Sequence, residues 1–128
     1  MNESSLHDGI ADLLAAFPGV TGCALVESSS GLVWYRHPDR LFDGLWEASI
    51  DHWRLHGRLG RHFEALGTLG AIVAYHREGA LAMIPCLRDP EVLLVCLGRH
   101  GEVDWIEWQR EAQRLGSRIR SAFEATPA

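Results

Sequence analysis

The stretch from Gly70 to Gly98 constrains the fold of this chain more than any other. It contains three apolar runs of strand length, separated by short turns. Gly79 supplies the flexible residue that a tight reversal needs, and Asp89-Pro90 favours a second turn. Connections this short join antiparallel neighbours, because a parallel crossover needs about a dozen residues or more. The sequence therefore predicts a three-stranded antiparallel meander in the C-terminal half.

The size and charge of the chain exclude several classes of function. Its 128 residues suit one domain, which we assign to residues 1–128. The net charge of −5 argues against a nucleic-acid-binding protein, which would carry a basic face. All the basic residues are arginine, so chemistry that needs a lysine is excluded. No apolar run approaches the length of a membrane span, and we expect no membrane insertion.

The three cysteines point to a reducing compartment. Cys23, Cys86 and Cys96 lie in separate apolar runs, and none is paired at the spacing of a metal site. We interpret them as buried, reduced thiols with packing roles. The polar, acidic start of the chain does not read as a signal peptide. We therefore expect a cytoplasmic protein.

The N-terminal half predicts a helix followed by a hairpin. Ser5 is a candidate helix cap, apolar residues follow at helical spacing, and Pro18 ends the pattern. Residues 20–26 are nearly all apolar, which predicts a strand covered on both faces and central in its sheet. A serine-rich turn then leads to a returning strand over residues 32–35.

A central helix is predicted from about Leu41, and it has two apolar flanks. The aromatic flank holds Phe42, Trp46, Ile50 and Trp53. The aliphatic flank holds Leu41, Leu45, Ala48, Leu55 and Leu59. Together they span far more than the roughly 100° that a core-facing stripe requires. One flank can cover the sheet and the other should then need a partner. Because aromatic side chains are enriched at interfaces, we predict that Phe42, Trp46, Ile50 and Trp53 contact a second copy.

The C-terminal half completes the order of elements. Glycines interrupt residues 58–69, which we leave open between a frayed helix, a short helix and a loop. Pro85 should lie at a strand end, a bulge or an outward-facing site. Asp104 is a candidate cap for a last amphipathic helix. The order helix-strand-strand-helix-strand-strand-strand-helix predicts an α+β fold, a layered sandwich with a five-stranded antiparallel sheet.

Two parts of the sequence carry a resemblance to a known family. The later part comprises Ile72-Val73, the turn at Gly79, Ala82-Met83-Ile84-Pro85 and Val92-Leu93-Leu94-Val95. The earlier part is Gly22-Cys23-Ala24-Leu25-Val26-Glu27 followed by Gly31-Leu32-Val33. In these segments and in its element order, the chain resembles the Roadblock/dynein light-chain family over roughly residues 5–123, with a profilin- or longin-like layered fold. Ser28-Ser29-Ser30 departs from the acidic or Asn residue that often opens the family's first turn.

The resemblance implies a dimer that joins two sheets through the central helix and the first strand of the meander. At the sheet edge it points to Ile72, Val73 and Tyr75. It further implies a non-enzymatic regulator or scaffold for a small GTPase or a larger assembly, often a polarity-type GTPase in bacteria. The family shares no catalytic residues, so none is carried over, and we expect a homodimer without cofactors.

Three other interpretations remain open. A secretion-chaperone-like dimer that holds an unfolded segment would fit the size and acidity, although such chaperones usually place three strands before the helix and two after it. A PAS-like ligand-sensing domain would need a cavity beside the sheet. His52 and His56 stand four apart, as in a zinc pair, with His62 as a third candidate. Trp53 replaces the glutamate of a metalloprotease motif, so we interpret these histidines as partly buried or interfacial.

Overall fold

The computed structural model describes residues 3–37 and 44–125, with side chains over 7–37 and 44–121. Three helices and a 3₁₀ segment accompany five strands, in the predicted order. The elements are α1 (Glu3–Ala16), β1 (Val20–Glu27), β2 (Val33–His37), α2 (Leu45–Arg58), η1 (Gly60–Leu66), β3 (Ile72–Tyr75), β4 (Gly79–Arg88), β5 (Glu91–Arg99) and α3 (Trp105–Ala125).

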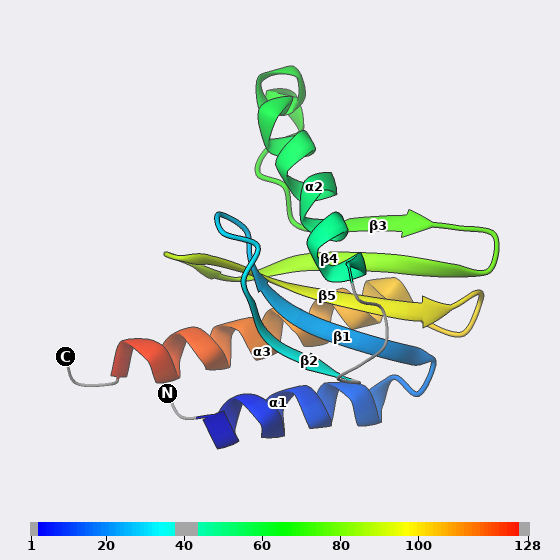
Figure 1. Cartoon of the computed structure of the whole chain (residues 1–128), viewed down its shortest axis with the longest axis vertical. Coiled ribbons are helices and arrows are strands. Elements are labelled where there is room, and N and C mark those ends of the chain that lie inside the picture. The colour runs from blue at the N-terminus through cyan, green and yellow to red at the C-terminus, as the bar shows by residue number, and fades with distance from the viewer. Residues whose placement is uncertain (1–2, 38–43, 126–128) are drawn as a thin grey trace.

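The strands form one antiparallel sheet in the order β2-β1-β5-β4-β3 (Figure 1). The predicted meander is the β3-β4-β5 half, and β1 then pairs with β5. β1 thus lies inside the sheet, buried on both faces along most of its length, as its apolar run predicts. This pairing leaves β2 at one edge of the sheet and β3 at the other.

The sheet has helices on both faces (Figure 1). On one face α1 and α3 cover a large apolar core around Ile10, Leu94 and Trp108. On the other face α2 covers a smaller core, in which Trp46 and Ile50 contact Met83 of β4. The layers are therefore helix, sheet, helix, which confirms the predicted α+β sandwich.

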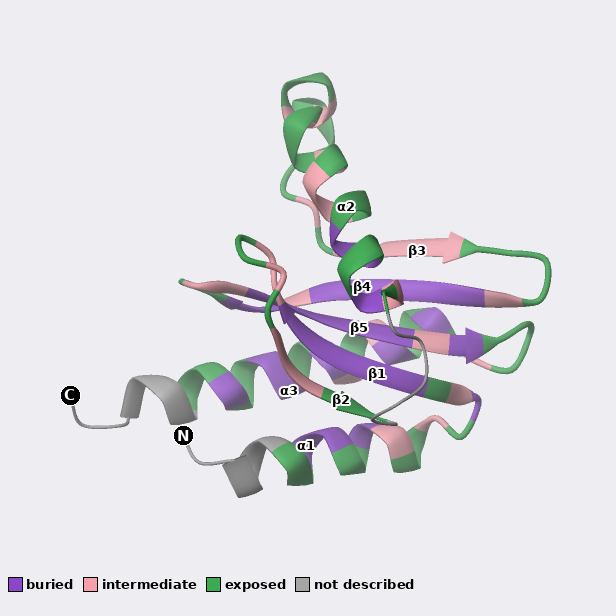
Figure 2. Cartoon of the chain, in the orientation of Figure 1, coloured by how far each residue is buried: buried purple, intermediate pink, exposed green. Residues whose placement is uncertain are grey.

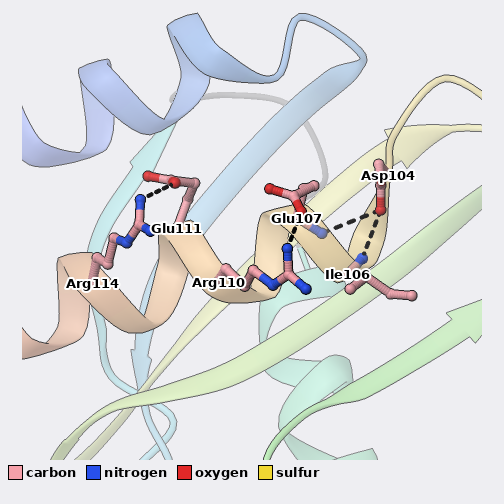
Figure 3. A network of polar contacts seen from close by, with 6 residues as sticks. All are labelled: Asp104, Ile106, Glu107, Arg110, Glu111 and Arg114. Carbon is pink, nitrogen blue, oxygen red and sulfur yellow. Dashed lines mark hydrogen bonds and ion pairs between the residues drawn. The ribbon is translucent and has the colours of Figure 1, made fainter.

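Local sequence signals explain several element boundaries. The side chain of Asp104 accepts hydrogen bonds from the backbone N–H groups of Ile106 (3.1 Å) and Glu107 (3.2 Å), so it caps α3 as predicted (Figure 3). The β4–β5 register shifts between Pro85 and Leu87, so of the three positions expected for Pro85 the structure shows the bulge. α1 begins at Glu3 rather than at Ser5, so Ser5 lies inside the helix.

Residues between the central helix and the meander adopt a short 3₁₀ helix, which resolves the ambiguity over 58–69. η1 runs from Gly60 to Leu66 and ends at Gly67, whose φ of 81° suits glycine. The central helix itself begins at Leu45, after Gly44 with φ 81°. The predicted start near Leu41 falls outside the described residues.

Candidate functional site

The outer edge of β3 is the first component of a candidate interaction surface. β3 pairs with β4 alone among the described strands, so backbone groups along its other side have no strand partner. Its four residues, Ile72 to Tyr75, include neither a proline nor a charged side chain, two of the devices that usually protect an edge strand from pairing. The Tyr75 side chain is 72% exposed. This edge is therefore open to pairing with a further strand.

The second component is the outward flank of α2, and here the structure changes the expectation. Trp46 and Ile50, predicted to face a partner, are 1% and 0% exposed and lie in the core beneath α2. Trp53 is half-buried against the same core. The aromatic flank thus faces the chain's own sheet. Trp46 and Ile50 have no surface left for a partner, and Phe42 lies outside the described residues.

The C-terminal part of the aliphatic flank of α2 faces outward instead, whereas Leu45 packs against the core beneath α2. Leu55 and Leu59 are 49% and 40% exposed, and Ala48 is exposed as well. Figure 2 shows that α2 is buried only where it crosses the sheet and becomes exposed where it extends beyond β3. We call the exposed side chains of Ala48, Leu55 and Leu59, together with the edge of β3, the α2–β3 surface.

A groove borders the α2–β3 surface. It has a volume of about 620 Å³ and lies between the first turns of α2 and the end of the β3–β4 hairpin. Leu45, Ala48 and His52 line it from α2, while His76 and Glu78 line it from the hairpin. The surface is therefore hollowed beside the helix and could seat side chains from a partner.

Polar contacts fix the direction in which α2 leaves the sheet. The carboxylate of Glu91, the first residue of β5, accepts hydrogen bonds from the hydroxyl of Ser28 (2.6 Å) and from the indole N–H of Trp53 (3.1 Å). The guanidinium of Arg54 donates to the backbone carbonyl of Ser28 (2.8 Å) and to that of Ser29 (3.4 Å). The β1–β2 turn and the start of β5 therefore hold the middle of α2, and the last turns of α2 extend beyond them.

The histidines of α2 do not assemble a metal centre in the part of the chain that the structure describes. No group of three or more His, Cys, Asp or Glu side chains with metal-binding geometry occurs there. The ring of His56 stacks on that of Phe63, with centroids 4.6 Å apart and planes 22° apart. His52 is exposed beside the groove. His56 thus has a packing role.

The cysteines lie in the core, as expected from their apolar runs. Cys23, Cys86 and Cys96 are all buried on the face covered by α1 and α3. Burial raises the pKa of the Cys86 thiol to about 12, and burial likewise raises the pKa of Cys96 well above its ordinary value. Neutral, inaccessible thiols are poor nucleophiles, so the packing interpretation fits their surroundings.

The fold is shared with several solved structures. A Roadblock/LC7 domain from Streptomyces avermitilis superposes with a TM-score of 0.74 at 20% identity, covering 90% of this chain and 94% of that one. MglB from Myxococcus xanthus gives 0.75 at 11% identity, covering 98% and 100%. The chain has the Roadblock/LC7 fold. MglC from Myxococcus xanthus is also similar, with a TM-score of 0.59 at 14% identity and coverage of 92% and 98%. No protein-family model and no curated protein matches the sequence.

The Roadblock/LC7 fold accounts for the grouping of the strands. Two strands precede α2 and three follow it, as the sequence predicts and opposite to the grouping expected of a secretion chaperone. Within the described ranges, no helix has the length and apolar character that crossing a bilayer requires.

Sequence reasoning identified both flanks of α2 but assigned the wrong one to the outside. The leucines that the structure exposes instead, Leu55 and Leu59, were named as members of the aliphatic flank but were not chosen. Side-chain size was the signal that could have found them. Trp46 and Trp53 each bury more apolar area against a sheet than a leucine does, so burying the aromatic flank stabilises the monomer more.

Proposed function

We propose that this chain is a non-enzymatic, dimeric interaction module that regulates or scaffolds a small GTPase or a larger assembly. The shared fold supports this proposal, because the Roadblock family that the sequence resembles contains small-GTPase regulators and scaffolds. One MglB structure has a tetrameric arrangement, so association of this fold with copies of itself has a precedent. The reduced thiols favour a cytoplasmic location.

The proposal is carried by the position of the α2–β3 surface. The open edge of β3 and the projecting end of α2 lie on the same side of the molecule (Figure 1). Two copies related by a twofold axis would pair their β3 strands antiparallel and join two five-stranded sheets into one. Each projecting α2 would then lie over the partner's half of the joined sheet, which would cover Leu55 and Leu59.

The residues proposed for the interface follow from this arrangement. Ile72, Val73 and Tyr75 stay in the proposal as the pairing edge. Trp53 stays as a half-buried neighbour whose indole is held by Glu91. Leu55 and Leu59 replace Trp46 and Ile50 as the apolar contacts of α2. Trp46 and Ile50 would support the interface only from the core beneath α2.

The decisive test is the solution mass of a double variant. Light scattering should give the mass of two chains for the wild type and of one chain for Leu55→Arg/Leu59→Arg, because buried guanidinium groups would face each other across the interface. Both leucines are exposed in the monomer, so the circular dichroism spectrum should not change. Ile106→Arg is the matched control, because Ile106 is 69% exposed on α3. A wild-type monomer at tens of micromolar, or a dimer unaffected by the double variant, would exclude this interface.

The GTPase role needs a separate measurement. A regulator of this kind would bind one nucleotide state of its partner more tightly and so shift the partner's equilibrium. We expect purified wild-type protein to change the rate of nucleotide release or hydrolysis by a polarity-type small GTPase. The monomeric double variant should lose this effect. If neither the binding nor the rate depends on the bound nucleotide, a scaffold role is favoured over regulation.

A further inference from the structure

A pocket on the opposite side of the sheet from α2 has a composition unlike its surroundings. Its volume is about 380 Å³, within the range typical of small-molecule sites. Three segments form it: the connection from η1 to β3, the bulged end of β4, and the C-terminal half of α3. α3 packs against β4 here, because a Cβ at Gly116 would make an ordinary van der Waals contact, 3.5 Å, with the Cα of Cys86.

The pocket is basic, although the protein as a whole carries a net charge of −5. Arg88 from β4 and Arg120 from α3 line it, and its described lining residues include no carboxylate. Cys86 also lines it, as a buried thiol whose pKa burial raises to about 12, so it is uncharged near neutral pH. The charge of the two guanidinium groups is therefore not neutralised inside the pocket.

Two other arginines of α3 are ion-paired, whereas Arg120, like Arg118, forms no ion pair within the described side chains. Arg110 pairs with Glu107, and Arg114 pairs with Glu111 at 2.6 Å (Figure 3). Each of these arginines has a glutamate three residues earlier in the helix. At the pocket the same spacing brings a serine instead, and Arg120 donates a hydrogen bond to the hydroxyl of Ser117 (3.2 Å). Within the described side chains, neither Arg88 nor Arg120 forms an ion pair.

Neutral donors complete the lining. The pocket is also lined by Thr68, Gln113 and Ser117, whose side chains carry hydroxyl or amide donors. Two guanidinium groups with added hydroxyl and amide donors match the oxygens of a tetrahedral dianion, and arginine is well suited to phosphate recognition. We propose that this pocket binds a phosphate group, either free phosphate or the phosphate of a small monoester.

This site is independent of the proposed dimer. It lies on the α3 side of the sheet, whereas the α2–β3 surface lies at the β3 edge and on the α2 face (Figure 1). The Leu55→Arg/Leu59→Arg variant should therefore keep phosphate binding. Failure of the dimer proposal and failure of the phosphate proposal can thus be told apart.

The test is a titration of the wild-type protein with inorganic phosphate and, separately, with glycerol 3-phosphate, at constant ionic strength. Amide chemical shifts in the NMR spectrum should change saturably around Gly70 and Ser117. Arg88→Gln/Arg120→Gln should weaken binding at least about ten-fold, because charge-assisted hydrogen bonds are lost. Arg110→Gln/Arg114→Gln makes the same change in net charge and should bind like the wild type. Both pairs are surface substitutions, and a circular dichroism spectrum checks that they fold.

The outcomes separate the possibilities. Tighter binding of the monoester than of inorganic phosphate assigns the site to a small phosphorylated metabolite, and equal binding assigns it to phosphate itself. The proposal is overturned if neither ligand causes saturable shifts up to about 10 mM, a concentration comparable to the dissociation constant of a weak site. Equal losses in the two double variants would overturn it too, since they would reveal a general charge effect.

Discussion

The two faces of the sheet differ in how completely their helices cover them. On the α1/α3 face, buried side chains run along both helices, and Trp105 and Trp108 meet edge to face at 5.4 Å. On the α2 face, Trp46 and Ile50 are buried, but the apolar flank beyond them is exposed (Figure 2). The first face is complete within one chain. The second is complete only where α2 crosses the sheet, so apolar surface remains where a partner would be needed.

The largest expected effect would come from a charge placed beneath α2. Trp46→Arg should lower the free energy of unfolding by about 3–5 kcal/mol, because it removes a buried aromatic side chain and leaves an uncompensated charge in the core. Urea unfolding followed by circular dichroism measures this change. Ile106→Arg, at a site on α3 that is 69% exposed and lies outside the proposed interface, should stay within about 0.5 kcal/mol of the wild type. A folded Trp46→Arg protein with an unchanged midpoint would mean that the aromatic flank faces outward after all.

A smaller effect should follow when the polar contacts that hold α2 are removed. Glu91→Ala removes the carboxylate that accepts hydrogen bonds from the Trp53 N–H and the Ser28 hydroxyl, at a cost of about 1–2 kcal/mol. Hydrogen exchange should accelerate along α2 more than along α3, because α2 has few other contacts with the sheet. Glu64→Ala, at an exposed site on η1, is the control. Unchanged exchange along α2 would show that its core contacts alone set its position.

Much of the fold could be predicted from the sequence, because strands and helix caps depend on local sequence patterns. The apolar runs predicted all five strands, Asp104 predicted the start of α3, and a bulge was one of the three positions expected for Pro85. These features need only the residues that form them and their nearest neighbours.

The features that the sequence did not predict depend on contacts between residues far apart in the chain. Periodicity showed two apolar flanks on α2, but only the position of the sheet decides which flank is buried. Likewise, the meander fixes the pairing of β3, β4 and β5. That β1 joins β5, which leaves β3 at the edge, follows from contacts across some seventy residues. The edge strand and the exposed leucines, which together make the candidate surface, both depend on this level of structure.

The ionisation of a buried thiol can test how completely α1 and α3 shield their face of the sheet from water. Cys86 is neutral in the folded chain, with its pKa raised from 9.0 to about 12 by burial. The unfolded chain releases this proton above about pH 9, so rising pH favours unfolding. The stabilising contribution is complete below pH 9 and is lost as the pH rises toward 12. Between pH 9 and pH 10 the free energy of unfolding should fall by about 1 kcal/mol from this group.

The control for this alkaline effect is Cys86→Ala, whose pH dependence should be shallower by that amount over the same interval. Urea unfolding at each pH provides the measurement. Equal slopes in the two proteins would mean that Cys86 ionises in the folded chain, and hence that water reaches this face.

The smallest effect should come from the charged outer side of α3. Glu111 and Arg114 form an ion pair at 2.6 Å, with 38% and 72% of their side chains exposed (Figure 3). Solvent screens such a pair, so Glu111→Gln should cost less than about 0.5 kcal/mol, and 0.5 M salt should remove the difference. Asp104→Ala is the contrast, because loss of a helix cap costs about 1 kcal/mol at any salt concentration. A salt-independent loss above 1 kcal/mol would show that this side of α3 is shielded from solvent. A small loss that salt removes would show that water solvates the charged outer side of α3, unlike the apolar outer side of α2.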